Sequence, residues 1–292
     1  MKSCFVTNDL LNKNKSFLKN KKFNCNLASM KKIVLLIVFL ISSLAHCQYM
    51  DPVASQMGSE FIKADQYIGQ DALGYQYFLK NSTLFKLKNG ESYQYKNIYL
   101  GKISKVDIQN SLKIVVFYES FNTVVILDSL LNEIQKIDFL INKQNIISSA
   151  VGISSRNNLW VFNSANQQVG LYDYLNKEYK TISIPITGTI KYYQTNVNNF
   201  FWIDENNDAY TCNVFGKIMN LGHVPDFDLV QLVSSLSIVF KKDGVLYYHI
   251  LNGDKNIAIT LEEKSYISFY YVDQNLSIFT DEGITKYQIN LP

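Results

Sequence analysis

The sequence predicts an all-β protein, a β-propeller of six blades with four antiparallel strands each, and three observations predict it. Apolar and polar residues alternate through stretches such as residues 157–184, as a pleated strand requires, and no helical period of useful length is present. The composition is rich in aromatic residues, with 20 Tyr and 18 Phe against four Pro. The pattern also repeats about every 40 residues, which is the period of a four-stranded propeller blade.

Two sets of positions measure this repeat. The second strand of each copy is expected to open on a large apolar residue, at Leu73, Leu112, Leu159, Phe201, Leu236 and Leu276. The turn before the last strand supplies the second set, Gly90, Asn132, Asn176, Gly216 and Gly253. Glycine and asparagine suit these turns because both tolerate positive φ. A pair of β-sandwiches has no reason to repeat at this period, and a β-solenoid repeats at a shorter one, so both alternatives are disfavoured.

The copies follow one another without linkers, so we predict one propeller domain over residues 61–292. The blades are expected over residues 61–98, 103–139, 146–186, 190–222, 227–261 and 266–290, in that order. A degenerate seventh blade, in residues 48–60 or near residue 140, is the alternative. The sixth copy shows three strands instead of four. Because an open ring would expose a strand edge, we expect the lead-in of residues 48–60 to supply the closing strand.

The first 47 residues have the composition of a leader. Residues 1–29 are basic and show no sustained apolar period, so we interpret them as a gene-model extension, with a genuine basic tail as the alternative. Residues 30–47 then read as a secretory signal peptide, in which Met30 and two lysines precede an apolar run and small residues. The run is too short to span a bilayer, which needs about 20 apolar residues. We expect cleavage after Cys47; lipidation of Cys47, in a weak lipobox, is the alternative.

Removing this leader changes the charge of the protein. The whole chain has a net charge of +3, but residues 1–47 hold eight lysines and one acid, so the remainder carries an excess of four negative charges. A basic nucleic-acid footprint is therefore missing, and we predict no nucleic-acid partner. Arg156 is the only arginine, and Cys212 is the only cysteine after the leader. We expect Cys212 to be buried and inert.

The sequence contains few candidates for a functional site. Trp160 and Trp202 occupy matching positions in consecutive copies and could form an aromatic platform for a sugar or a peptide. Packing between blades is the alternative, and we favour it. Arg156, at a turn just upstream of Trp160, could lie on the same rim, although a solvated surface arginine is the commoner case. These three residues are the candidate binding residues.

No motif for catalysis or metal binding stands out. His223 and His249 lie in different copies, and neither has the neighbours that a zinc site needs. The acidic stretch 204–208 comes nearest to a calcium loop but lacks its glycine, so we interpret it as a turn between strands. We predict no catalytic residue, no metal and no cofactor. Paired carboxylates of a glycosidase stay open, because their spacing exists only in the fold.

Copies such as L-W-V-F-N followed by L-Y-D-Y-L-N-K, and V-V-I-L-D-S-L-L-N-E-I, resemble the repeats of bacterial WD40-like and YVTN-like β-propeller proteins. The resemblance covers about residues 61–292 and rests on the pattern alone. The G-H and W-D dipeptides of WD40 blades, the boxes of sialidase-like propellers and the docking repeats of quinoprotein propellers are all missing. The resemblance implies a propeller of six to eight blades.

These observations lead to hypotheses of different classes. We expect an exported, non-enzymatic propeller that acts as a protein-interaction scaffold in the envelope of a Gram-negative bacterium, in the periplasm or at the outer membrane. Its membrane association would come through a protein partner or through a lipid on Cys47. A hydrolase or lactonase with a metal or carboxylates in the central funnel is the alternative, and acids converging on the axis would favour it. A glycan-binding module using Trp160 and Trp202 is the third hypothesis.

Overall fold

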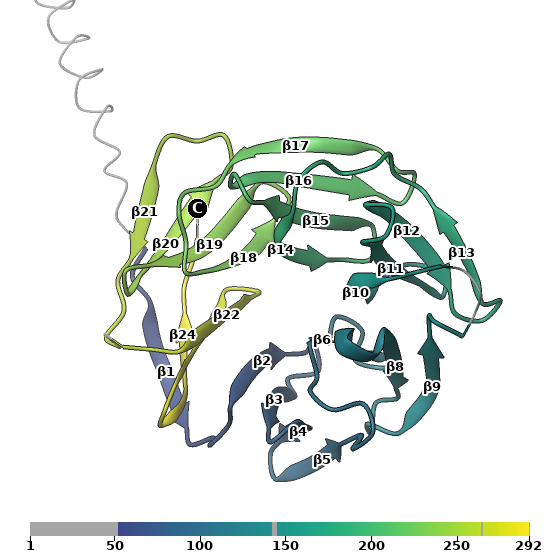
Figure 1. Cartoon of the computed structure of the whole chain (residues 1–292). Coiled ribbons are helices and arrows are strands. Elements are labelled where there is room, and N and C mark those ends of the chain that lie inside the picture. Colours follow the sequence, from purple (N-terminus) through teal and green to yellow (C-terminus); the bar gives the residue numbers. More distant parts are fainter. Residues whose placement is uncertain (1–51, 142–144, 264, 292) are drawn as a thin grey trace, which may run out of the picture. The chain divides into compact units, whose positions relative to one another are not determined.

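The computed structural model describes residues 52–141, 145–263 and 265–291. The leader predictions for residues 1–47, including the start at Met30 and the lipid on Cys47, lie outside the described residues. Six four-stranded sheets follow one another around a ring, and neighbouring strands within each sheet are antiparallel (Figure 1). The predicted fold class, an all-β propeller with six four-stranded blades, is confirmed.

Five of the six sheets are simple meanders of four consecutive strands. Blade one contains β2 (Gln66–Gln70), β3 (Gln76–Lys80), β4 (Thr83–Lys88) and β5 (Glu91–Tyr95). Blade two contains β6 (Lys105–Asp107), β7 (Ile114–Tyr118), β8 (Thr123–Leu127) and β9 (Glu133–Asp138), with a single 3-10 turn, η1 (Glu119–Phe121), between its middle strands. Blade three contains β10 (Ser148–Ile153), β11 (Asn158–Asn163), β12 (Gln168–Asp173) and β13 (Glu178–Thr181). Blade four contains β14 (Ile190–Thr195), β15 (Asn199–Asp204), β16 (Asp208–Asn213) and β17 (Ile218–His223). Blade five contains β18 (Leu229–Ser234), β19 (Ser237–Lys242), β20 (Val245–Ile250) and β21 (Asn256–Ile259).

Blade six is built from both ends of the propeller. Strands β22 (Ser268–Val272), β23 (Asn275–Thr280) and β24 (Gly283–Gln288) form three positions of the sheet, and β1 (Ser55–Glu60) forms the fourth by pairing antiparallel with β24. The register runs from Ser55 opposite Gln288 to Glu60 opposite Ile284. Gly283 is required at the turn into β24, because its φ is +134° and a Cβ there would lie 2.2 Å from the carbonyl oxygen of Glu60. The ring is therefore sealed by a strand from the N-terminal side.

The expected openings of the second strands divide into two kinds. Three are buried within second strands: Leu159, Phe201 and Leu276. The other three lie in the turn before the second strand and are exposed: Leu73, Leu112 and Leu236. The spacing therefore located the blades, but the prediction that all six residues open a strand was wrong. A large apolar residue at a strand boundary can face the core or the solvent, and periodicity alone does not separate the two.

The turns between third and fourth strands contain all five residues of the second set, as predicted. The conformational reason holds for only part of the set. Gly90 and Gly216 have positive φ, but at the other turns in this set the positive φ falls on Leu131, Lys177 and Asn252. In several of these turns the side-chain oxygen of a preceding aspartate or asparagine accepts backbone N–H groups of the turn, which lets a residue other than glycine take the left-handed conformation.

The core consists of separate apolar clusters, one at each seam between neighbouring blades. Each blade buries both faces of its sheet against its neighbours, and six clusters of buried residues follow the ring in order. The largest lies between blades one and two, and the smallest lies between blades six and one, where Ile62, Tyr67, Phe279 and Ile284 meet. The inner strands are therefore held from both sides, which fixes the residues that face the axis.

Candidate functional site

The innermost strand of each blade lines a central channel. Strands β2, β6, β10, β14, β18 and β22 lie nearest the axis of the ring (Figure 1). Residues of these strands line a cavity of about 450 Å³. Charged side chains in the lining are few, namely Lys105, Asp107 and Asp273. Tyrosines contribute much of the remaining wall, including Tyr192 and Tyr270. The channel thus combines aromatic surface with a small number of polar groups, the composition typical of a small-molecule site.

The Asp107 carboxylate connects neighbouring blades through hydrogen bonds. Its carboxylate accepts hydrogen bonds from the backbone N–H of Ile153 at 2.8 Å and of Gln109 at 3.0 Å. It also accepts from the side-chain amide of Gln109 at 3.1 Å and from the hydroxyl of Thr195 at 3.2 Å. Burial raises the pKa of Asp107, and these donors act in the opposite direction by stabilising the charged form. Asp107 therefore joins blade two to blades three and four.

Two glutamines make the same kind of connection farther round the ring. The side-chain amide of Gln194 donates to the carbonyl oxygen of Leu232 at 3.0 Å and accepts from its N–H at 3.0 Å. Gln231 does the same with Tyr271, at 2.7 and 2.8 Å. Each amide behaves as an extra peptide group bridging two inner strands, which satisfies backbone groups that face the next blade. Much of the polar wall of the channel is therefore structural.

The inner strand of blade three is recessed. Its sequence is S-S-A-V-G-I, and Gly152 is essential because a Cβ there would lie 2.0 Å from the hydroxyl oxygen of Thr195. The small residues allow blades two and four to meet in front of β10. The Gln109 side-chain amide, for example, donates to the carbonyl oxygen of Thr195 at 2.6 Å.

A second feature lies on the face of the ring that carries the turns between first and second strands and between third and fourth strands, which we call the turn face. In six turns a side-chain oxygen of Asp, Asn or Ser accepts the N–H of the residue two positions on, at 2.8–3.2 Å. In a further turn of this face, between β14 and β15, Asn196 accepts the N–H of the polar residue Asn198 at 2.9 Å. In the six turns the residue is large and apolar: Leu73, Leu112, Leu130, Leu175, Phe215 and Leu236. These six apolar turn residues are 51–88% exposed.

A basic pocket of about 360 Å³ opens among the first turns of blades two to four, on the same face. Lys113 and Arg156 line it, and none of the residues that line it is acidic. The Lys113 ammonium donates to the hydroxyl of Tyr174 at 2.8 Å and to the side-chain oxygen of Asn157 at 3.2 Å. Both acceptors are neutral, so the pocket keeps its positive charge although the propeller as a whole is acidic.

The structure separates the three residues predicted from sequence. Trp160 and Trp202 are 0% and 2% exposed, and both belong to the cluster between blades three and four. The Trp160 indole N–H donates to the carbonyl oxygen of Asn196 at 2.8 Å, and the Trp202 ring stacks on Tyr210 with centroids 5.3 Å apart. Enclosed rings offer no platform to a ligand. Arg156 alone of the three is exposed, and it lines the basic pocket.

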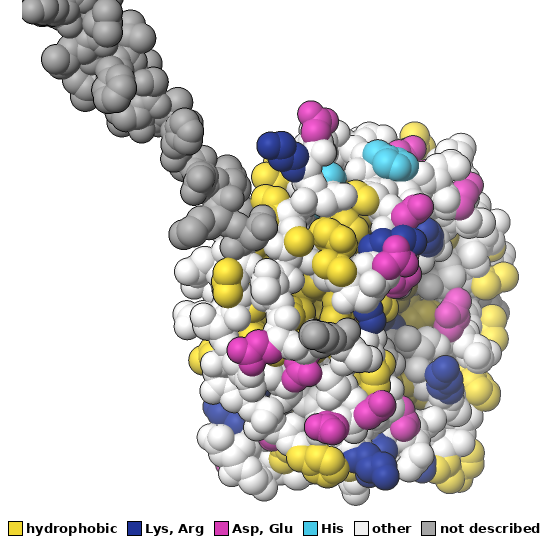
Figure 2. Space-filling view, turned by 90° about the vertical axis from the view of Figure 1, so that its left-hand side faces the viewer, with side chains coloured by type: hydrophobic (Ala, Val, Ile, Leu, Met, Phe, Trp, Pro, Cys, Tyr) yellow, Lys and Arg dark blue, Asp and Glu magenta, His cyan; other side chains and the backbone are white. Residues whose placement is uncertain are grey.

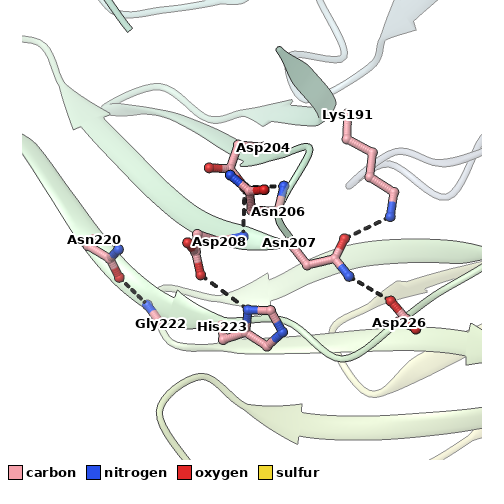
Figure 3. A network of polar contacts seen from close by, with 9 residues as sticks. All are labelled: Lys191, Asp204, Asn206, Asn207, Asp208, Asn220, Gly222, His223 and Asp226. Atoms are coloured by element: carbon pink, nitrogen blue, oxygen red, sulfur yellow. Dashed lines mark hydrogen bonds and ion pairs between the residues drawn. The ribbon is translucent and has the colours of Figure 1, made fainter. Parts of the chain in front are cut away.

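The acidic stretch 204–208 is the turn between β15 and β16, as expected (Figure 3). Asp204 accepts the backbone N–H groups of Asn206 and Asp208, at 2.9 and 2.8 Å, and so folds the turn. Asn207 accepts a hydrogen bond from Lys191 and donates one to Asp226. The Asp204 carboxylate therefore serves the turn itself, and the side-chain oxygen of Asn207 serves Lys191 on β14.

His223 lies at the end of β17, exposed beside Asp208 with a separation of 3.1 Å between ring nitrogen and carboxylate (Figure 3). His249 is buried in blade five. Across the described residues, no group of three or more His, Cys, Asp and Glu is placed to hold a metal ion. In the same part of the chain, no helix has the length and apolar character to cross a membrane.

The outer side of the ring at blades five and six has a mixed surface. Hydrophobic, acidic and basic side chains are interspersed there (Figure 2). A groove of about 900 Å³ runs beside β1 and the turn before β24, lined by the carboxylates of Glu60, Glu263, Asp281 and Glu282. Glu263 accepts a hydrogen bond from the Thr285 hydroxyl at 2.8 Å. Acidic residues alone do not define a ligand.

Comparison with known proteins supports the fold. The chain is similar to a virginiamycin B lyase from Staphylococcus aureus, with a TM-score of 0.53 and 12% identity over 76% of this chain and 79% of that one. It is also similar to a streptogramin B lyase, with a TM-score of 0.52 and 10% identity over 84% and 89%. A protein of unknown function from Bacteroides thetaiotaomicron has a TM-score of 0.53 at 13% identity, over 81% and 72%. Identities this low establish a shared β-propeller fold and nothing about activity. No protein-family model and no curated protein matches the sequence.

Proposed function

We propose that this protein is an exported, non-enzymatic β-propeller that serves as a protein-interaction scaffold in the cell envelope, and that its partner docks on the turn face. The observation that carries the proposal is the recurrence of one turn in blades one to five. In each copy a polar side chain accepts a backbone N–H and so fixes the turn, and the leucine or phenylalanine that donates this N–H is exposed to solvent. Single exposed apolar residues are ordinary on protein surfaces, but six on one face through the same hydrogen bond form a repeated feature.

The basic pocket indicates the chemistry of the partner. Leu112 and Leu175 directly adjoin the pocket residues Lys113 and Tyr174, and exposed Val197 lines the pocket itself. A partner segment that carries apolar side chains around one acidic group would therefore match both the shape and the charge of this region. Apolar contacts would supply most of the binding free energy, and the carboxylate would set the register.

The main alternative, a hydrolase or lactonase acting in the funnel, requires carboxylates that converge on the axis and stay free for chemistry. The acids that line the channel in the described residues are Asp107 and Asp273. Asp107 already accepts four hydrogen bonds from blades two to four. A carboxylate held in this way supports the ring, so the scaffold is the function that the geometry supports best.

The test compares two triple variants of the chain that begins at Gln48. One changes Leu112, Leu175 and Phe215 to Ser on the turn face; the control changes Ile98, Tyr99 and Ile184 to Ser, which are equally exposed in loops at the opposite face. Affinity capture from gently solubilised envelopes should retrieve a stoichiometric partner with the wild type and the control, but not with the turn-face variant. A wild-type protein that stays a clean monomer, or a partner lost equally from both variants, would contradict the proposal.

A further inference from the structure

Lys105 extends into the central channel. It is the first residue of β6, and its ammonium nitrogen lies 5.0 Å from the ring centroid of Tyr193 and 5.8 Å from that of Tyr192. Both tyrosines belong to β14, two blades away, so the lysine side chain crosses in front of β10. This path is open because β10 contributes only Val151 to the described lining of the channel.

The positive charge of Lys105 has no counter-charge at contact distance. Asp107 follows two positions later on the same strand, but its oxygens are occupied by the donors of Ile153, Gln109 and Thr195. Within the described ranges, no carboxylate oxygen lies within 4.0 Å of the Lys105 ammonium. Burial lowers the pKa of Lys105, and Asp107 opposes that shift only through space. The ammonium therefore relies on the faces of two aromatic rings.

Aromatic faces stabilise a cation but accept no ordinary hydrogen bond, so the donors of this ammonium remain available. The channel around it is bounded by further tyrosine side chains. Burial raises the pKa of Tyr270 to about 12, which keeps that phenol protonated and neutral at physiological pH. The cavity, at about 450 Å³, falls within the size of small-ligand pockets, which run from roughly 300 to 1,000 Å³.

We propose that the channel is a binding site for a small organic carboxylate with an apolar or aromatic body, whose anionic group pairs with Lys105. The carboxylate would supply the acceptor oxygens that the ammonium lacks, and the tyrosines of β14 and β22 would contact the body of the ligand. None of the six apolar turn residues lines the channel, so this site can be present or missing without affecting the scaffold proposal.

Benzoate is a suitable probe because it combines a carboxylate with an aromatic ring, and benzamide is its neutral match. Titration calorimetry on the chain beginning at Gln48 should show benzoate binding, and at least tenfold weaker binding of benzamide. Lys105→Gln should weaken benzoate at least tenfold, whereas Lys105→Arg, which keeps the charge, should retain most of the affinity. Lys102→Gln removes an exposed lysine of the preceding loop and should leave the affinity unchanged.

Three results would overturn the proposal. They are no benzoate binding at millimolar concentration, equal binding of benzamide, and a Lys105→Gln variant that binds benzoate as well as the wild type does. Circular dichroism and the thermal midpoint of each variant show whether it is folded, and a folded Lys105→Arg variant keeps the test decisive even if Lys105→Gln is unstable.

Discussion

Blade one is held differently on its two sides. Toward blade two, fourteen buried residues form the largest apolar cluster of the propeller. Toward blade six, only four buried residues meet. Apolar burial contributes roughly 1.5–3 kcal/mol for each fully buried large side chain, so the two seams differ widely in hydrophobic stabilisation. The ring therefore needs another source of stability where it closes.

The closing seam compensates through close approach. A Cβ on Gly69 would lie 2.7 Å from the ring of Tyr270, so this ring packs directly on the backbone of β2. Tyr67 meets the same ring edge-on, with centroids 6.4 Å apart, and lies over Phe279. Strand β1 then covers the edge of β24. Seams between successive blades can rely on large side chains, whereas the seam between distant parts of the chain depends on one glycine and one added strand.

Removing the closing strand should have the largest effect on stability. A chain that begins at Phe61 lacks β1, whose side chains are all exposed, and with it the buried residues Pro52 and Ala54. The loss is therefore mainly one of backbone hydrogen bonds and edge cover, with a small loss of apolar burial at Ala54. We expect the free energy of unfolding to fall by about 3–5 kcal/mol and the thermal midpoint by about 10 °C, relative to the chain that begins at Gln48. An unchanged midpoint in a thermal melt would show that the ring closes by other contacts.

Gly69→Ala tests the close approach itself. The new methyl group would meet the Tyr270 ring, and φ at this position is +147°, which disfavours a side chain. We expect a loss of about 2–3 kcal/mol in denaturant titrations. Gly58→Ala is the matched control, since nothing lies within 4 Å of a Cβ there, and its effect should stay within about 0.5 kcal/mol. If the two variants lose the same free energy of unfolding, the close approach at Gly69 does not contribute to holding the closing seam.

Gln194→Ala probes a seam that has both an apolar cluster and a polar bridge. It leaves the N–H and carbonyl of Leu232 without their partner, so we expect a loss of about 1–2 kcal/mol, smaller than at Gly69. Gln56→Ala, on exposed β1, serves as the control. If the two glutamine variants unfold at the same denaturant concentration, the amide bridges contribute nothing to holding the blades.

Cys212 allows the seams to be compared without changing stability. It is buried at the seam between blades three and four, and burial raises its pKa to about 11, so the thiol is protonated at pH 8. In the chain beginning at Gln48, iodoacetamide should modify it at least a thousandfold more slowly than the unfolded protein. In Gly69→Ala the rate of Cys212 modification should rise only in proportion to the larger fraction of globally unfolded protein. Fast modification with unchanged global stability would show that blades three and four separate on their own.

The sequence predicted the architecture well because blades repeat and strands alternate. Period, turn positions and the missing strand of blade six were all readable before any side-chain contact was known. What periodicity could not decide was orientation at strand boundaries, which is why Leu73, Leu112 and Leu236 were expected in strands and instead lie exposed in turns. The hydrogen bonds that the N–H groups of these leucines donate to the side chain two positions earlier decide that outcome, and they depend on local geometry.

The candidate sites were harder to predict. Both tryptophans drew attention as large aromatics in matching positions, yet matching positions in a propeller usually face a neighbouring blade, and here both are enclosed. The sequence does contain a signal for the exposed turn residues, because Asp, Asn or Ser followed two positions later by Leu or Phe recurs in the turns. Lys105 had no comparable signal, because its position opposite Tyr193 follows from the recessed strand of blade three.

The pairing of β1 with β24 has a consequence for how this protein can be made. A ribosome releases Ser55 long before its ladder partner Gln288, because the other five blades lie between them in the chain. The five earlier blades can stack as they emerge, but the ring cannot close until β24 has been synthesised. Until then β1 has no partner and the inner strand of blade one has no neighbour on one side. A nascent chain in this state exposes a strand edge and an apolar blade face, which makes it prone to aggregation until the ring closes.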